Sequence, residues 1–175
     1  ENLRIISMGN QVTTIRSGAF QGSGLQYFYI GTNIDYVDNS NLTIIEDAVF
    51  NSCNIENIYI PSSVETIGKM LFYNSEKLTE ITFAHNTRIT KIDDYAFANC
   101  TNIQFLDIPK SVTTIGAYAF MNCNKLVNMN LHESITDISI HAFDSCALSQ
   151  ISLPNLNTLG INAFTNIQFT SNSPI

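Results

Sequence analysis

A phenylalanine returns seven times along this 175-residue chain at nearly constant spacing. The intervals between successive positions are 30, 22, 25, 23, 23 and 21 residues. The seven positions are Phe20, Phe50, Phe72, Phe97, Phe120, Phe143 and Phe164. A period of about 23 residues is typical of a solenoid, in which each repeat forms one coil that cannot bury its apolar side chains alone. The chain must therefore build one elongated core from stacked coils.

An apolar-x-apolar step lies between successive phenylalanines and predicts a short strand. Its period of two gives that strand one buried face. The steps are Phe28/Ile30, Ile58/Ile60, Ile81/Phe83, Leu106/Ile108, Met129/Leu131 and Ile151/Leu153, and residues 3–8 carry a similar pattern. Pro61, Pro109 and Pro154 directly follow three of these steps. Because proline has no N–H to donate, it ends the strand there.

The Ile-Gly-x-x-Ala-Phe-x-x-Cys-x-x-Leu run at 115–126 and the Ile-Pro-x-Ser-Val-x-x-Ile links at 60–67 and 108–115 are the most regular parts of the repeat. These motifs resemble the BspA-like, or Treponema-type, leucine-rich repeat family, and the resemblance covers nearly the whole chain. It implies a protein of the kind found on the surface of host-associated bacteria and in large protist families. Some members of the family look like adhesins for host matrix proteins.

We therefore predict the α/β class: a right-handed leucine-rich repeat solenoid of about seven coils. Short parallel strands are expected on the concave face and short helical or 3₁₀ turns on the convex face. The chain begins inside a repeat, so residues 1–175 are expected to form a single solenoid domain, a fragment of a longer protein. Two repeats carry insertions, about eight residues between Val37 and Ile45 and a short one at 84–88, and both are expected to bulge from a rim.

Composition excludes several partners. The formal net charge is −7 and the sequence pI is about 4.7, which argues against nucleic acid and anionic membrane surfaces. No apolar run approaches the length of a membrane span, so we expect no direct membrane insertion in this segment.

The four cysteines share one place in the repeat, three residues after a phenylalanine. They are Cys53, Cys100, Cys123 and Cys146, and the same place holds Ser23, Ser75 and Ile167 in other repeats. A position that accepts serine, cysteine and isoleucine indicates a small buried packing site, which favours free structural thiols over disulfides. A zinc site would need four ligands that converge on one point, and a row along a solenoid does not converge.

The sequence contains no recognisable catalytic constellation. His85, His132 and His141 occupy different repeat positions and are expected on different faces. The adjacent acidic pairs at 46–47 and 93–94 point apart, so neither forms a general acid/base dyad. No phosphate-binding loop or nucleophile motif is present. We expect no enzyme activity, no cofactor and no metal.

The residues that point out of the predicted strand face are the candidates for binding a partner. Tyrosine combines apolar area with a polar tip and is enriched at binding hot spots. The candidate ligand-binding residues are Tyr27, Tyr29, Tyr59, Phe105, Asp107, Asn128 and Asn130. The alternative is that these aromatic side chains pack against cross-strand neighbours and the asparagines form a hydrogen-bonded ladder.

The repeat pattern predicts a non-catalytic protein-binding module. The family resemblance implies that the module belongs to a cell-surface or extracellular leucine-rich repeat protein, and that adhesion to host or matrix proteins is one role it could have. Two alternatives stay open. One is a cytoplasmic or cytoskeletal scaffold, which the unpaired thiols favour. The other is a carbohydrate-binding module, which the tyrosines and abundant asparagines favour, and it makes a glycan the second candidate ligand.

Overall fold

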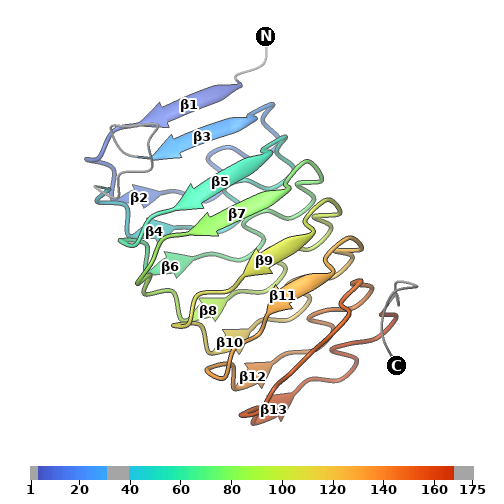
Figure 1. The fold of residues 1–175 in the computed structure, drawn as a ribbon. Helices are drawn as coiled ribbons and strands as arrows, with labels where there is room; N and C mark the ends of the chain where they lie inside the picture. The colour runs from blue at the N-terminus through green and yellow to red at the C-terminus, as the bar shows by residue number, and fades with distance from the viewer. Residues whose placement is uncertain (1–3, 31–39, 168–175) are drawn as a thin grey trace.

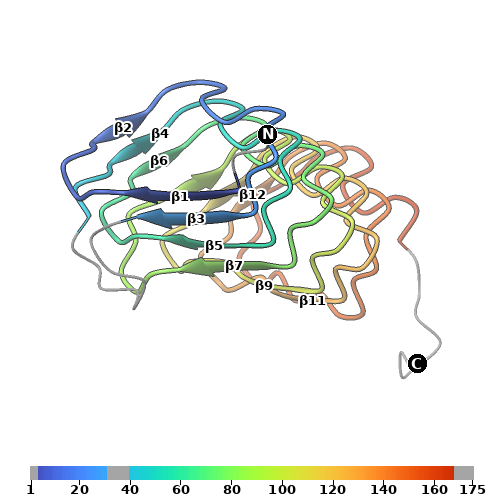
Figure 2. The same ribbon diagram turned by 90° about the horizontal axis from the view of Figure 1, so that it is seen from above.

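The computed structural model describes residues 4–30 and 40–167, which form a solenoid with two rows of parallel strands (Figure 1). Figure 2 shows the two rows on different sides of the coil. The long row contains β1 (Ile5–Met8), β3 (Tyr27–Ile30), β5 (Asn57–Ile60), β7 (Glu80–Phe83), β9 (Phe105–Asp107) and β11 (Asn128–Asn130). The short row contains β2 (Thr14–Ile15), β4 (Ile44–Ile45), β6 (Thr66–Ile67), β8 (Lys91–Ile92), β10 (Thr114–Ile115), β12 (Asp137–Ile138) and β13 (Thr158–Leu159).

The repeated phenylalanines form a stacked spine through the core, as the sequence predicts. Successive rings from Phe20 to Phe164 have centroids 5.1 to 5.6 Å apart. The five inner members are almost completely buried: Phe50, Phe72, Phe97, Phe120 and Phe143. Each ring therefore touches the ring of the coil before it and of the coil after it, so the spine joins all coils into one hydrophobic core.

The prediction of a helical or 3₁₀ stretch around each phenylalanine is wrong, because no helix occurs in residues 4–30 or 40–167. The Phe120 N–H bonds to Ala142 O of the next coil at 2.8 Å, whereas the Cys123 N–H bonds back to Phe120 O at 3.1 Å. Bonds to the next coil thus alternate with tight turns, and the i→i−4 bonds of an α-helix do not form. Within the described residues, there is also no helix of the length and apolar character that a membrane span needs.

The turns depend on left-handed residues two positions before and two positions after each phenylalanine. The first set is Gly18, Ala48, Met70, Tyr95, Tyr118, His141 and Asn162. The second set is Gly22, Ser52, Asn74, Asn99, Asn122, Ser145 and Asn166. Positive φ is uncommon outside glycine and asparagine, and here it reverses the chain direction so that alternate N–H groups reach the next coil.

The predicted number of about seven coils is slightly too high, since the long row has six strands and the solenoid makes about six turns in the described residues. The seventh predicted strand, at Ile151 and Leu153, is irregular. Ile151 is 41% exposed, and the backbone hydrogen bond that ties this stretch to the preceding coil is that from Ser149 N to Val127 O. With so little pairing, the stretch leaves its backbone to solvent.

The coil that contains β7 and β8 is skewed: its two strands pair with different neighbouring coils. Its long strand β7 pairs with β5 of the preceding coil, whereas its short strand β8 pairs with β10 of the following coil. The insertion at 84–88 connects the two strands and supplies the extra length that this shift needs. As a result, both rows are interrupted at this coil, between β7 and β9 and between β6 and β8. The adjacent rings of Phe72 and Phe97 are tilted by 20°.

The four cysteines are buried and unpaired in disulfides, as predicted. Each thiol also donates a hydrogen bond to a phenylalanine carbonyl of an earlier coil, for example from Cys100 Sγ to Phe72 O at 3.0 Å and from Cys123 Sγ to Phe97 O at 3.1 Å. Ser75 Oγ makes the same bond to Phe50 O at 2.6 Å. In the five inner coils, this repeat position therefore holds a small side chain that also donates a hydrogen bond.

We expect the thiols to be inert in the folded protein. Burial raises the pKa of Cys146 to about 12 and that of Cys123 well above its usual range, so the reactive thiolate is scarce at neutral pH. Titration with a thiol reagent, without reductant, should detect four groups after denaturation and almost none before. Fewer than two in the denatured chain, or rapid reaction in the folded one, would contradict this arrangement.

Candidate binding site

The long row carries all seven predicted ligand-binding residues on its strands, but their exposure differs. Phe105 is 58% exposed, and Asp107, Asn128 and Asn130 are also exposed. Strand pairing places Asn128 opposite Phe105 and Asn130 opposite Asp107. The predicted residues of β9 and β11 therefore form one continuous exposed group.

The three predicted tyrosines lie near the other end of the same row and are half-buried. Tyr27 and Tyr29 are on β3, and Tyr59 is on the adjacent strand β5. The Tyr27 hydroxyl donates to Glu56 Oε2 at 3.4 Å, and Tyr27 lies opposite Asn57. Full exposure, which the sequence led us to expect, is not found. Each of these side chains therefore leaves only part of its surface for a ligand.

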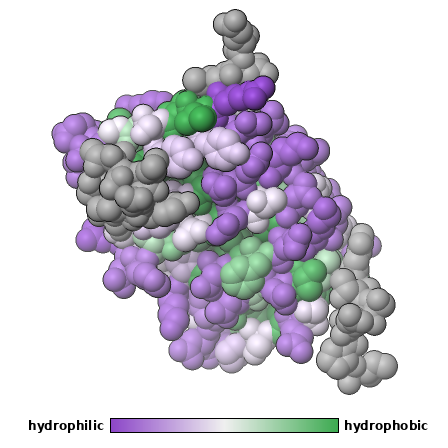
Figure 3. Space-filling view, turned by 45° about the horizontal axis from the view of Figure 1, so that its top comes forward, coloured by the Kyte–Doolittle hydropathy of each residue, from purple (hydrophilic) through white to green (hydrophobic). Residues whose placement is uncertain are grey.

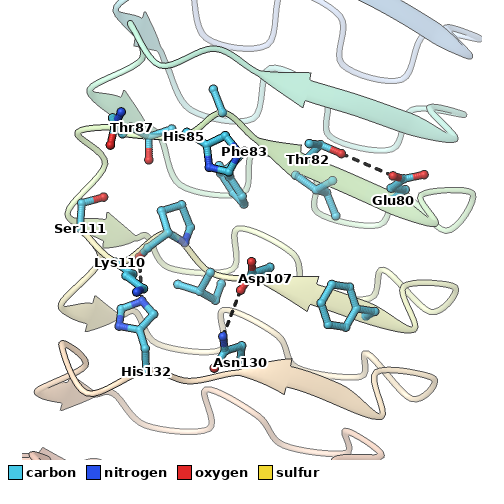
Figure 4. A pocket seen from close by; sticks show the side chains of 16 residues that line it. Glu80, Thr82, Phe83, His85, Thr87, Asp107, Lys110, Ser111, Asn130 and His132 are labelled. Carbon is cyan, nitrogen blue, oxygen red and sulfur yellow. Dashed lines mark hydrogen bonds between the residues drawn. The ribbon is translucent and has the colours of Figure 1, made fainter. Parts of the chain in front are cut away.

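A groove of about 890 Å³ lies on the long-row face where β7 and β9 are not hydrogen-bonded to each other. Among the described residues, no backbone hydrogen bond joins these two strands. Figure 4 shows the side chains that line the groove. They come from β7, the insertion, β9 with the turn after it, and β11. The skewed coil thus opens a groove that a regular solenoid lacks.

The charged groups of the groove are separated along the strands. Glu80 lies at one end and Asp107 near the middle, while His85 and Lys110 lie toward the other end, on opposite sides of the groove (Figure 4). Glu80 accepts a bond from the Thr82 hydroxyl, and Asp107 accepts one from an Asn130 amide, both long at 3.4 Å. None of the ion pairs in the described part of the chain involves these four residues.

His132 lines the same end of the groove but has a structural role. Its Nε2 lies 2.8 Å from Pro109 O, and its Nδ1 accepts a bond from the Ser134 N–H at 3.3 Å. This pairing fits the neutral ring with its proton on Nε2, so both nitrogens are already occupied. The expectation that the histidines occupy different faces is wrong for His85 and His132. The insertion moves His85 to the groove, whereas His141 lies at a turn beside Tyr118.

One buried polar atom at the groove has no partner. Thr87, in the insertion, is 6% exposed, and its Oγ1 makes no hydrogen bond to any described residue. Leaving a buried hydroxyl unpaired costs about 1–3 kcal/mol, so such a group indicates a place where a ligand or solvent supplies the missing bond.

A smaller hollow of about 440 Å³ lies between β11 and residues 150–152. The face seen in Figure 3 is largely hydrophilic, with apolar side chains scattered in small areas. No group of three or more metal-ligating side chains occurs in residues 4–30 and 40–167. The long-row face, with its groove, is therefore the candidate site. Sequence reasoning found Phe105, Asp107 and Asn130 there. It did not select Glu80, although alternation along β7 also points this residue outward, nor His85 and Lys110, which lie outside the strand pattern.

The chain belongs to the BspA-type leucine-rich repeat family. The family model for the BspA type leucine rich repeat region matches six copies, over residues 1–42 and 43–170. This agrees with the repeat period, the phenylalanine spine and the parallel-strand solenoid. A search of curated proteins finds no match to this chain.

Several solved structures share the fold. A leucine-rich repeat protein from Eubacterium ventriosum is 22% identical with a TM-score of 0.81, over 98% of this chain and 45% of that one. The pneumococcal vaccine antigen PcpA is 29% identical with a TM-score of 0.62, over 77% of this chain and 29% of that one. A leucine-rich cell surface protein from Faecalibacterium prausnitzii is 24% identical with a TM-score of 0.61, over 95% of this chain and 46% of that one. The chain thus spans less than half the length of each of these structures.

Proposed function

We propose that this solenoid is a non-catalytic protein-binding module of a cell-surface protein, and that it binds through the face of the long strand row. The observation that carries the proposal is the group of exposed, weakly bonded side chains around the β7–β9 groove. Phe105 supplies apolar area there, and Asp107 and Asn130 supply polar contacts. A central aromatic side chain with a polar surround is the usual composition of a binding hot spot.

The scaffold behind this face is rigid. The spine of stacked phenylalanines and the parallel strand pairs hold the outward side chains at fixed spacing. A partner that binds a pre-formed face immobilises few additional groups, so little ordering free energy opposes association.

Adhesion as the role is supported by membership of the family alone, whereas a surface location is also supported by one of the similar structures. The pneumococcal protein is named a vaccine antigen. An intracellular scaffold is the main competing function, and the unpaired thiols are compatible with it.

Solid-phase binding tests the proposal. The protein is applied to immobilised fibronectin, laminin and collagen and, in parallel, to a glycan array. We expect saturable binding to at least one protein, which free glycans do not compete away. Binding to glycans alone would make this a carbohydrate-binding module, and the absence of binding to either surface would favour the scaffold.

A further inference from the structure

We propose that the β7–β9 groove binds the carboxyl-terminal end of an extended peptide, with the peptide running parallel to β7 and β9. This inference rests on the proposed function, because it names the part of a protein partner that the long-row face would recognise. Three independent features of the groove carry it: its charge distribution, its unpaired polar groups and its length.

The charges suit a molecule with a positive group at one end and a negative group at the other. His85 and Lys110 lie at the end of the groove toward which β7 and β9 run, and Glu80 lies at the opposite end (Figure 4). His85 and Lys110 are exposed and form no ion pair with any residue that the structure describes. A peptide carboxylate placed beside them, with a lysine or amino terminus near Glu80 and Asp107, would satisfy both ends.

Four of the eight Lys and Arg side chains in the described residues form ion pairs, and Lys110 is one of the other four. Elsewhere on the solenoid, cations and carboxylates bridge neighbouring coils, as in the Lys69–Asp94 pair at 3.0 Å and the Arg88–Glu65 pair at 2.8 Å. In the groove the acids and bases stand apart along the strands and do not neutralise one another. The separation leaves both signs of charge available to a ligand.

Polar groups of the groove also lack partners of their own. The strands β7 and β9 share no backbone hydrogen bond there, although neighbouring long strands on either side of this step are paired. A peptide main chain carries alternating donors and acceptors and can satisfy such groups, whereas a small inorganic anion satisfies only one end.

The groove has the length of a short peptide. Glu80 and His85 are five residues apart, as are Phe105 and Lys110. At about 3.3 Å per residue, each interval spans at most about 16 Å, which is the length of about five extended residues. The volume of about 890 Å³ lies within the usual range for ligand sites. The exposed ring of Phe105 would pack against an apolar side chain of the peptide.

The proposal is tested by adding peptides to the isotope-labelled protein and monitoring its amide chemical shifts by NMR. The probe is a pool of tetrapeptides with a fixed amino-terminal lysine and free carboxyl termini, and the comparison is the same pool with amidated termini. We expect the free-acid pool to shift the amides of His85, Thr87 and Ser111, with an affinity about 3- to 10-fold higher than that of the amidated pool. Equal affinities, shifts confined to other regions, or no shifts would overturn the proposal.

Two variants separate this site from general charge effects. Lys110→Ala should reduce the affinity of the free-acid pool by about 3- to 10-fold and abolish its advantage over the amidated pool. The control Lys77→Ala removes an exposed lysine that does not line the groove, and should leave the affinity unchanged. If the tetrapeptides fail while the protein still binds an immobilised matrix protein, the peptide proposal falls and the proposed function stands. If the tetrapeptides bind but no immobilised matrix protein does, the peptide site stands and the proposed function falls.

Discussion

Substitution of Phe120 by alanine is expected to destabilise the protein by about 3–5 kcal/mol. The side chain is completely buried, and its ring stacks on Phe97 at 5.2 Å and on Phe143 at 5.3 Å. Removing the ring leaves a cavity between the rings of Phe97 and Phe143. The backbone bonds from Phe120 N to Ala142 O and from Asn122 N to Asp144 O limit how far the neighbouring coils can collapse into that cavity.

The measurement is thermal or urea unfolding of the variant and the parent protein side by side. A loss of this size corresponds to a decrease in Tm of roughly 6–20 °C for a chain of this length. Phe105→Ala is the matched control because it deletes the same side chain from the same solenoid at a position that is 58% exposed. The control should change stability by about 0.5 kcal/mol or less. Similar losses for both variants would refute the assignment of the phenylalanine spine as the main source of cohesion.

Gly116→Ala is expected to cost about 1–3 kcal/mol, for a different reason. A Cβ at Gly116 would lie 2.7 Å from the backbone atoms Asp93 C and Asp94 N of the preceding coil. The same coil holds Gly116 by a bond from its N–H to Ile92 O at 2.8 Å. Because the added methyl group would meet backbone atoms of the preceding coil, which cannot rotate away as a side chain can, the two coils would have to separate to admit it.

Gly9→Ala provides the control for this prediction. A Cβ at Gly9 would meet no atom within 4 Å, so the substitution should be close to neutral, or slightly stabilising because alanine restricts the unfolded chain. Urea unfolding of the two variants should show a lower midpoint for Gly116→Ala alone. A neutral Gly116→Ala would mean that the coils are less tightly stacked at this step than the structure has them.

The repeat period and the period-two steps were sufficient to predict the spine and the parallel strands. Both follow from side-chain burial, and burial leaves a direct pattern in the sequence. The turn between strand and phenylalanine was predicted as helical because its length and composition suit a helical turn. Its actual bonds, such as Phe97 N to Ala119 O, join residues of different coils. A local pattern does not reveal a bond whose partner lies a whole repeat away.

Only part of the candidate site could be predicted, because some of its residues come together through pairing between different coils. Phe105, Asp107 and Asn130 follow from alternation along a strand, and the structure places them at the groove. His85 and Lys110 lie outside the regular strand pattern. They come together because the insertion at 84–88 lets one coil pair with different neighbours in the two rows. The sequence shows that residues are added there, and only the three-dimensional pairing shows where the sheet opens.

The most direct test of the account compares two exposed apolar residues as arginine variants in the matrix-protein binding assay. Phe105→Arg changes the centre of the long-row face, at a side chain that is 58% exposed, and Leu159→Arg changes β13 of the short row, at one that is 56% exposed. We predict that Phe105→Arg weakens binding by about tenfold or more, and that Leu159→Arg leaves it unchanged. Equal effects, or a loss only in Leu159→Arg, would show that the long-row face is not the binding surface.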